Sequence, residues 1–181
     1  DFLATITYPP NPFRNFDNTL PNDLPLPGHH TTGRFRPAGL PLANGNARNG
    51  LTLFRPPNQL DGGNLACSAC HTLPTGAGSD HMVQGSVYVP FPRGPNGENH
   101  LALIPSDGST NVSLKVPQLR NLYAKVGFDA TQLVNRSGFG FQHDGAVDSI
   151  ERFANSQFFQ VQDAQSTSDL VAFLPAFSGS D

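Results

Sequence analysis

The stretch Cys67-Ser68-Ala69-Cys70-His71 decides how the rest of this chain is interpreted. Its two cysteines are the only ones in the 181 residues, and they stand three positions apart. Such a pair cannot supply the several disulfides that hold small secreted domains together. The role of the two thiols must therefore be local, within one turn of the chain and beside the histidine that follows.

The spacing of this pentapeptide is typical of covalent haem attachment. Two thiols on one helical turn can add to the two vinyl groups of haem, while the next residue, His71, ligates the iron. A zinc site would need two further ligands at suitable spacing, and no second C-x-x-C is present. A thioredoxin-like pair would require a βαβ context, which the surrounding Pro and Gly residues do not favour. We therefore expect one covalent haem c and its iron, held by Cys67, Cys70 and His71.

The composition suits a single loop-rich domain with a large cofactor in its core. Charged residues make up only 14% of the chain and hydrophobic residues 37%, while 18 Gly and 17 Pro favour turns and fixed loops. The net charge of -3, without any Lys/Arg cluster, argues against nucleic acid or an anionic membrane surface as a partner. No apolar run approaches the length of a membrane span.

We expect a mainly α, cytochrome c-like helical domain around one covalent haem, preceded by an extended Pro-rich arm. Residues 1–41 are rich in proline and show little periodicity, so they are expected to pack on the core as this arm. Residues 42–177 form the cytochrome c domain, and residues 178–181 are a linker-like tail. Because the chain starts without Met, we interpret it as a mature or excised piece of a longer exported protein, and as a monomeric domain of it.

Apolar residues at helical spacing predict several helices within the domain. The predicted helices are 42–54, capped by Asn44 or Asn46 and stopped by Pro56-Pro57; about 64–71, carrying the cysteines; 117–126, starting at Pro117; one after Asp144 through Ala154; and one starting near Ser168 and ending before Pro175. Residues 72–112 are expected to be mostly loop, with one short strand at 86–89.

His71 fills one axial position of the iron, so the function depends on what fills the other. Met82 is the only methionine of the chain, and about ten residues of loop can span roughly 30 Å, enough to reach the far face of the haem. His81 beside it would instead give two imidazole ligands and a lower potential. Lys115 and His143 are further options, and Met82 could also be an ordinary core side chain. The sequence leaves these alternatives open, with Met82 preferred.

Two further segments carry a resemblance to a known family. Residues 115–122, KVPQLRNL, and residues 140–147, GFQHDGAV, follow the C-x-x-C-H and resemble the signature of bacterial di-haem cytochrome c peroxidases. The variant at 119–127 is more similar to mono-haem relatives in large secreted bacterial proteins, some of which accompany carbohydrate-binding modules. The resemblance covers about residues 42–177. It implies that Arg120 contacts a haem propionate, as a planar cation suits, and that His143 lines the haem pocket.

The chain departs from that family in two respects. The methionine ligand of the electron-transfer haem lies in the family some fourteen residues after the histidine matched by His143, and the residue there is Gln157. A peroxidase of the family also needs a second haem, and this chain has no second C-x-x-C-H. Met82 therefore has to be argued separately, and the resemblance favours electron transfer over peroxidase activity.

The leading hypothesis is a mono-haem c-type cytochrome that exchanges single electrons with a protein redox partner and has no catalytic residues. Because c-type haem attachment takes place outside the cytoplasm, we expect a periplasmic or extracellular location. The resemblance implies a copper-dependent polysaccharide monooxygenase as a partner. The alternatives are a peroxidase or gas-ligand sensor with an open or labile sixth site, and an interaction module that haem merely stabilises. The midpoint potential, and a calcium ion among the Asp/Asn/Gly loops, are left undecided by the sequence.

Overall fold

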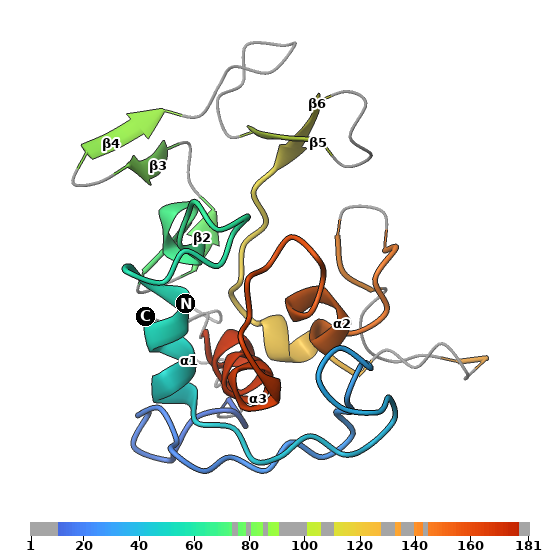
Figure 1. The fold of residues 1–181 in the computed structure, drawn as a ribbon. Helices are drawn as coiled ribbons and strands as arrows, with labels where there is room; N and C mark the ends of the chain where they lie inside the picture. Colours follow the sequence, from blue (N-terminus) through green and yellow to red (C-terminus); the bar gives the residue numbers. More distant parts are fainter. Residues whose placement is uncertain are drawn as a thin grey trace.

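A computed structural model describes residues 11–73, 76–78, 81–84, 87–90, 101–105, 111–127, 133–134, 140–142 and 145–177 (Figure 1). The described residues form three α-helices, three short 3-10 turns and three antiparallel hairpins. The helices are α1 (Ala47–Phe54), α2 (Ile150–Ala154) and α3 (Ala164–Phe173), and the 3-10 turns are η2 (Cys67–Ala69), η3 (Leu122–Ala124) and η4 (Leu174–Ala176). The hairpins pair β1 (His71–Thr72) with β2 (Ala77–Gly78), β3 (His81–Gln84) with β4 (Val87–Pro90), and β5 (Leu101–Pro105) with β6 (Asn111–Lys115).

Helix α1 begins at an asparagine cap. The side chain of Asn46 accepts a hydrogen bond from the backbone N–H of Asn49 at 3.0 Å, which satisfies one of the free N–H groups of the first turn. The helix ends at Phe54, just before the two prolines. The predicted helix is therefore confirmed from Ala47 onward, with Asn46 as its cap. Its predicted first residues lie outside it, because Gly45 pairs there with Leu24 of the N-terminal segment.

Helix α3 packs directly against α1, and the two lie side by side in Figure 1. Asp163 caps α3 by accepting from the N–H of Ser166, so the helix predicted near Ser168 is confirmed but begins earlier, at Ala164. Glycine makes the close approach possible: a Cβ at Gly50 would lie 2.5 Å from the Cβ of Phe173. The close contact between the two helices therefore requires glycine at position 50 of α1.

The centre of the core is aromatic. The rings of Phe54, Phe173 and Phe177 lie 5.0 to 5.5 Å apart between centroids, and all three side chains are buried. Aromatic pairs at this spacing add to the stabilisation that comes from removing apolar area from water. A second, smaller cluster joins Leu60, Val161 and Leu170 on another side of α3.

Two of the predictions on local structure differ from what the structure describes. Part of the range 72–112 lies outside the described residues, and most of the described ones form hairpin strands where loop was expected; the strand expected at 86–89 is β4, Val87–Pro90, and Ser86 lies outside the described residues. The helix predicted from Pro117 to Val126 is only the three-residue turn η3. The backbone N–H of Leu119 instead donates to the carbonyl of Gly76, and Asn121 adopts a left-handed φ of 54°. A helix cannot pass through the left-handed Asn121, which lies inside the predicted range.

The helix predicted after Asp144 is shorter than expected, since α2 spans only Ile150–Ala154. Ser149 caps it by accepting from the N–H of Arg152. Among the described residues, no helix is long and apolar enough to cross a membrane. Short helices and hairpins both contribute to the described part of the chain, so the mainly α cytochrome c-like class stays a prediction.

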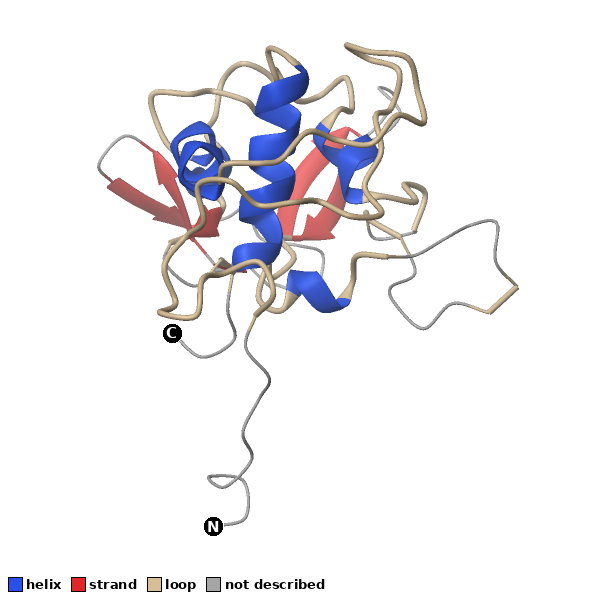
Figure 2. Ribbon diagram, turned by 90° about the horizontal axis from the view of Figure 1, so that it is seen from below, coloured by secondary structure: helices blue, strands red, loops and turns tan. Residues whose placement is uncertain are grey.

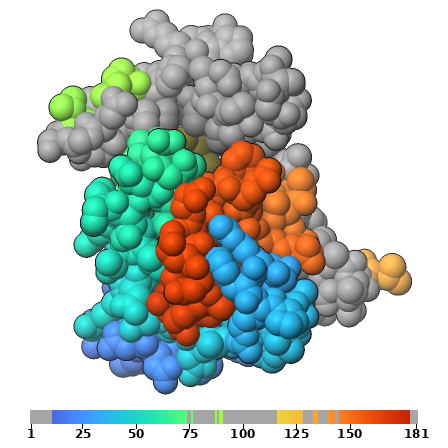
Figure 3. Space-filling view, in the orientation of Figure 1, coloured from blue at the N-terminus to red at the C-terminus, as the bar shows by residue number. Residues whose placement is uncertain are grey.

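Residues 11–46 contain no helix. Loops, drawn in tan in Figure 2, run across the helices. The expected arm, residues 1–41, is described only from residue 11, and from here on the arm means residues 11–46; residues 1–10 and 178–181 lie outside the described chain. On the face drawn in Figure 3, the blue residues of the arm lie against the orange and red C-terminal segments. Leu26 is buried in the main cluster, and Phe13, Leu20 and Leu24 pack against it. The arm therefore contributes side chains to the core.

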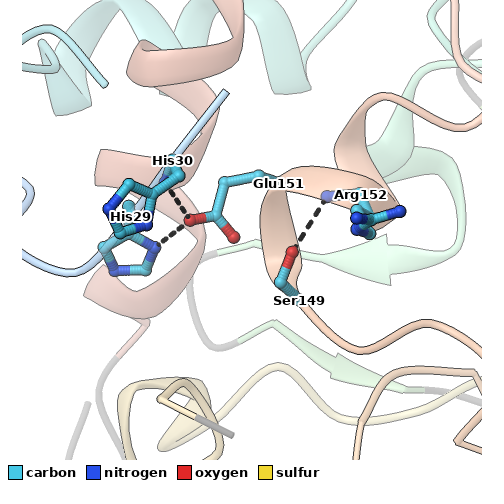
Figure 4. A network of polar contacts seen from close by, with 5 residues as sticks. All are labelled: His29, His30, Ser149, Glu151 and Arg152. Atoms are coloured by element: carbon cyan, nitrogen blue, oxygen red, sulfur yellow. Dashed lines mark hydrogen bonds and ion pairs between the residues drawn. The ribbon is translucent and has the colours of Figure 1, made fainter. Parts of the chain in front are cut away.

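A buried carboxylate ties the arm to α2. Glu151, 3% exposed, accepts from Nδ1 of His29 at 2.6 Å and from the backbone N–H of His30 at 3.2 Å (Figure 4). An ionised carboxylate can only accept, so His29 carries its proton on Nδ1. Burial alone would raise the pKa of Glu151, but the hydrogen bond and charge of His29 outweigh it and hold that pKa below its ordinary value.

Replacing Glu151 with glutamine should make the stability of the protein less dependent on pH. Because the pKa of Glu151 is depressed in the folded chain, its contribution is present above the ordinary value of 4.5 and is lost as the pH falls through the lower folded pKa. We expect Glu151→Gln to cost about 2 kcal/mol at neutral pH and much less at a pH below the folded pKa of Glu151. Urea unfolding curves of both proteins, at neutral pH and at a pH below the folded pKa of Glu151, measure the two differences in the free energy of unfolding. An equal loss at both would contradict the assigned charge.

Candidate functional site

The two cysteines lie at opposite ends of one tight turn. Cys67 begins η2, and the N–H of Cys70 donates to the carbonyl of Cys67 at 3.3 Å. Both are free thiols and both are partly exposed. His71 follows directly and opens β1, where it pairs with Gly78. The helix predicted over 64–71 is thus a single 3-10 turn, and it still keeps the two thiols and the imidazole in immediate succession.

Apolar residues surround this turn. Cys67 packs against both the aromatic cluster and the smaller cluster of Leu60, Val161 and Leu170. Ala66 and Ala69, on either side of it, are buried. The turn is therefore seated between two parts of the core.

Burial keeps both thiols protonated. It raises the pKa of Cys67 to about 12 and that of Cys70 to about 11, and the negative charge of Asp61 acts in the same direction. Reactive cysteines need the opposite, a pKa lowered by nearby cations or a helix N-terminus. This environment is unfavourable for a thioredoxin-like dithiol, which must attack as a thiolate.

His71 is held neutral against the aromatic cluster. Its ring centroid lies 6.4 Å from that of Phe54. Burial lowers the pKa of His71 to about 4, and the carbonyl of Pro117 acts in the opposite direction. A neutral imidazole has one nitrogen lone pair free for a metal. The Nδ1 atom of His71 is buried and makes no hydrogen bond within the described part of the chain.

The fold brings the segment 115–122 to the cysteine turn, although many residues separate them. The backbone carbonyl of Pro117 raises the pKa of His71, and the N–H of Leu119 donates to the carbonyl of Gly76 at 2.8 Å. A Cβ at Gly76 would lie 2.7 Å from the ring of Phe177 and 3.0 Å from the Cβ of Leu119, so this crossing has no room for a larger residue. The sequence alone did not indicate this role of Pro117, because there it suits only a helix start.

The other predicted site residues are only partly placed. Arg120 is exposed in the turn that precedes η3. The backbones of His81 and Met82 lie in β3, paired with Pro90 and Val89, and β3 lies beside η2. Lys115 ends β6, paired with Leu101. His143 and Asp144 lie outside the described residues.

No group of three or more His, Cys, Asp or Glu side chains within the described ranges could hold a metal ion. The described residues therefore offer no metal site built from protein side chains alone, and they add no third zinc ligand to Cys67 and Cys70. No protein family model, curated protein or solved structure matches the chain. The assignment of a function must depend on the geometry and chemistry of the cysteine turn itself.

Proposed function

We propose that the chain is a mono-haem c-type cytochrome domain that exchanges single electrons with an extracytoplasmic protein partner. The observation that supports this most is the succession of two protonated, partly exposed thiols and a neutral imidazole on one turn. The three groups do not bond to one another. The thiols form no disulfide, and the Nδ1 atom of His71 has no hydrogen-bond partner among the described residues.

The residues present suit a covalently held haem. The S–H groups of Cys67 and Cys70 would each add across a vinyl C=C, sulfur to one carbon and hydrogen to the other, with no leaving group. His71 would ligate the iron with one ring nitrogen. Its second nitrogen then needs an acceptor to orient the ring, and the carbonyl of Pro117 is suited to that role. When bound, haem supplies a one-electron couple between ferrous and ferric iron.

The apolar setting favours such a group energetically. The aromatic cluster and the smaller cluster both reach the turn, so a haem bound there would remove further apolar area from water. We keep Arg120 as the residue that would pair with a propionate, because it is exposed and next to the segment that crosses the turn. His143 is kept as a residue that lines the pocket.

Met82 is the proposed sixth ligand. The strand β3, which carries it, lies beside η2, and ten residues of chain lie between His71 and Met82. A thioether opposite an imidazole gives a higher potential than two imidazoles, which suits an electron carrier. The proposed partner is a protein oxidase such as a copper-dependent polysaccharide monooxygenase, in the periplasm or outside the cell.

Optical spectra of the purified holoprotein in both redox states test this function. We expect a six-coordinate low-spin haem that becomes high-spin in Met82→Ala, because removal of the thioether leaves the sixth position to water. His81→Ala and Val83→Ala, on either side of Met82 in β3, are matched controls and should retain the low-spin state.

Two outcomes would contradict the proposal. A parent protein that is already high-spin and binds peroxide or carbon monoxide would favour a peroxidase or gas-ligand sensor. Loss of the low-spin state in His81→Ala but not in Met82→Ala would replace the His/Met pair by two imidazoles and imply a lower potential.

A further inference from the structure

A polar pocket of about 630 Å³ lies between the arm and α2. Thr32 and Arg34 of the arm form one side of it, and Asp148, Arg152 and Asn155 form much of the other. None of these residues belongs to the cysteine turn, and none has a role in the proposed electron transfer. The volume falls in the range of small-molecule sites, about 300 to 1,000 Å³.

The guanidinium group of Arg34 is fixed in place. Its Nη1 atom donates to the carbonyl oxygens of Asn155, Ser156 and Phe159 at 3.3, 3.2 and 3.0 Å. It also stacks 5.0 Å from the ring centroid of Phe35. The opposite edge, Nε and Nη2, has no partner among the described residues. Two parallel N–H groups on a rigid plane match the two oxygens of a carboxylate.

Asp148 supplies a negative charge to the pocket. Its Oδ1 atom is closed to solvent and lies 3.2 Å from Nε of Arg152, with which it forms an ion pair. Because a ligand cannot reach this buried oxygen, Asp148 contributes its charge to the pocket rather than a hydrogen bond from Oδ1.

Thr32 supplies one more polar group. Its hydroxyl oxygen accepts from the side-chain amide of Asn155 at 3.0 Å, which leaves its own proton available. Asn155 is held in turn, because its amide oxygen accepts from Thr167 at 2.8 Å. The wall of the pocket at Thr32 is therefore preorganised to donate a hydrogen bond.

Charge balance selects the kind of ligand. Arg34 and Arg152 contribute two positive charges and Asp148 one negative charge, so the pocket carries +1 and a single carboxylate neutralises it. A zwitterionic amino acid would leave that charge uncompensated and bring its ammonium group close to Arg152. We propose that this pocket binds a small monoanionic hydroxycarboxylic acid, with its carboxylate on Arg34 and its hydroxyl oxygen accepting a hydrogen bond from the hydroxyl of Thr32.

Titration calorimetry of the full-length holoprotein with matched probes tests the site. Gluconate should bind and sorbitol, which has a hydroxymethyl group in place of the carboxylate, should not. Lactate should bind more tightly than propionate, which lacks the hydroxyl, and more tightly than alanine, which has an ammonium group in its place. The three small probes thus differ at a single substituent.

Substitutions connect the binding to the named groups. Arg34→Lys keeps the positive charge but removes the two parallel N–H donors at Nε and Nη2, and should weaken gluconate binding by about tenfold or more. Thr32→Val, which removes the hydroxyl donor and keeps the size of the side chain, should abolish the preference for lactate over propionate. Arg36→Gln, an exposed arginine of the same segment, is the matched control and should leave the affinity within about twofold. Circular dichroism checks that each variant is folded.

Three results would overturn the proposal. They are equal binding of gluconate and sorbitol by the parent, an unchanged gluconate affinity in folded Arg34→Lys, and tighter binding of alanine than of lactate. The last would assign the pocket to amino acids instead.

Discussion

The double variant Cys67→Ser, Cys70→Ser should carry no covalent haem when it is exported in a host with c-type maturation machinery. Serine hydroxyls have the size of the thiols but do not add to vinyl groups, so the turn would keep its shape and lose its chemistry. Haem staining of a denaturing gel and the mass of the intact chain measure the attachment. We expect complete loss of both signals in the double variant and a weaker, single attachment in either single variant.

Ser68→Ala is the control for this experiment. It changes a residue inside the same turn without touching the three groups that would hold the haem, and should be loaded like the parent. Covalent haem in the double variant would contradict the assignment of the cysteines. A parent protein that is exported with the machinery but purifies without haem, or with stoichiometric zinc, would overturn the proposed function.

Gly50→Ala should destabilise the protein strongly, although alanine is normally the better residue inside a helix. A Cβ at this position would lie 2.1 Å from the carbonyl oxygen of Asp169 and 2.5 Å from the Cβ of Phe173, so α1 and α3 would have to separate. We expect a loss of about 3 kcal/mol from overpacking and a fall in Tm of about 10 °C. Thermal unfolding followed by circular dichroism measures it.

Asn49→Ala makes a matched comparison, because Asn49 precedes Gly50 in α1 and its side chain is exposed. Here alanine should be neutral or slightly stabilising through its helix propensity. Equal stabilities of the two variants would show that the contact between α1 and α3 is looser than the structure indicates.

The helical part of the fold could be predicted where a strong local signal coincided with a cap. In α1, the spacing of Leu51 and Phe54, the cap at Asn46 and the following prolines all agree, and the predicted helix is confirmed there. In α3, the apolar positions were recognised but the capping Asp163 was not, so the predicted start was late.

The predictions were wrong for segments whose conformation is set by residues distant in sequence. Pro117 suited a helix start, but the segment forms long-range contacts with His71 and Gly76 instead, and no local pattern reports such contacts. Apart from β4, the strands of the hairpins around 72–112 were not predicted, because they are short and flanked by Pro and Gly, which are typical of loops. The wall of the pocket at Arg34 could not be predicted for the same reason, since its partners lie beyond residue 154.

The candidate site could be predicted from the sequence because its three central residues are close together along the chain. Cys67, Cys70 and His71 are neighbours in sequence, so spacing alone brought them together. Their environment, which keeps the thiols protonated and the imidazole neutral, depends on Asp61, Phe54 and the core beneath, and only the structure could supply it.

The pairing of α1 with α3 has a consequence for the order of events during folding. The two helices stand at opposite ends of a long stretch of chain, so their contact closes a large loop and is entropically slow to form. The cysteine turn lies inside that loop and is seated in the core only once the loop has closed. If the chain carries covalent haem as proposed, its thiols would be most accessible to a maturation enzyme in the interval before the loop closes.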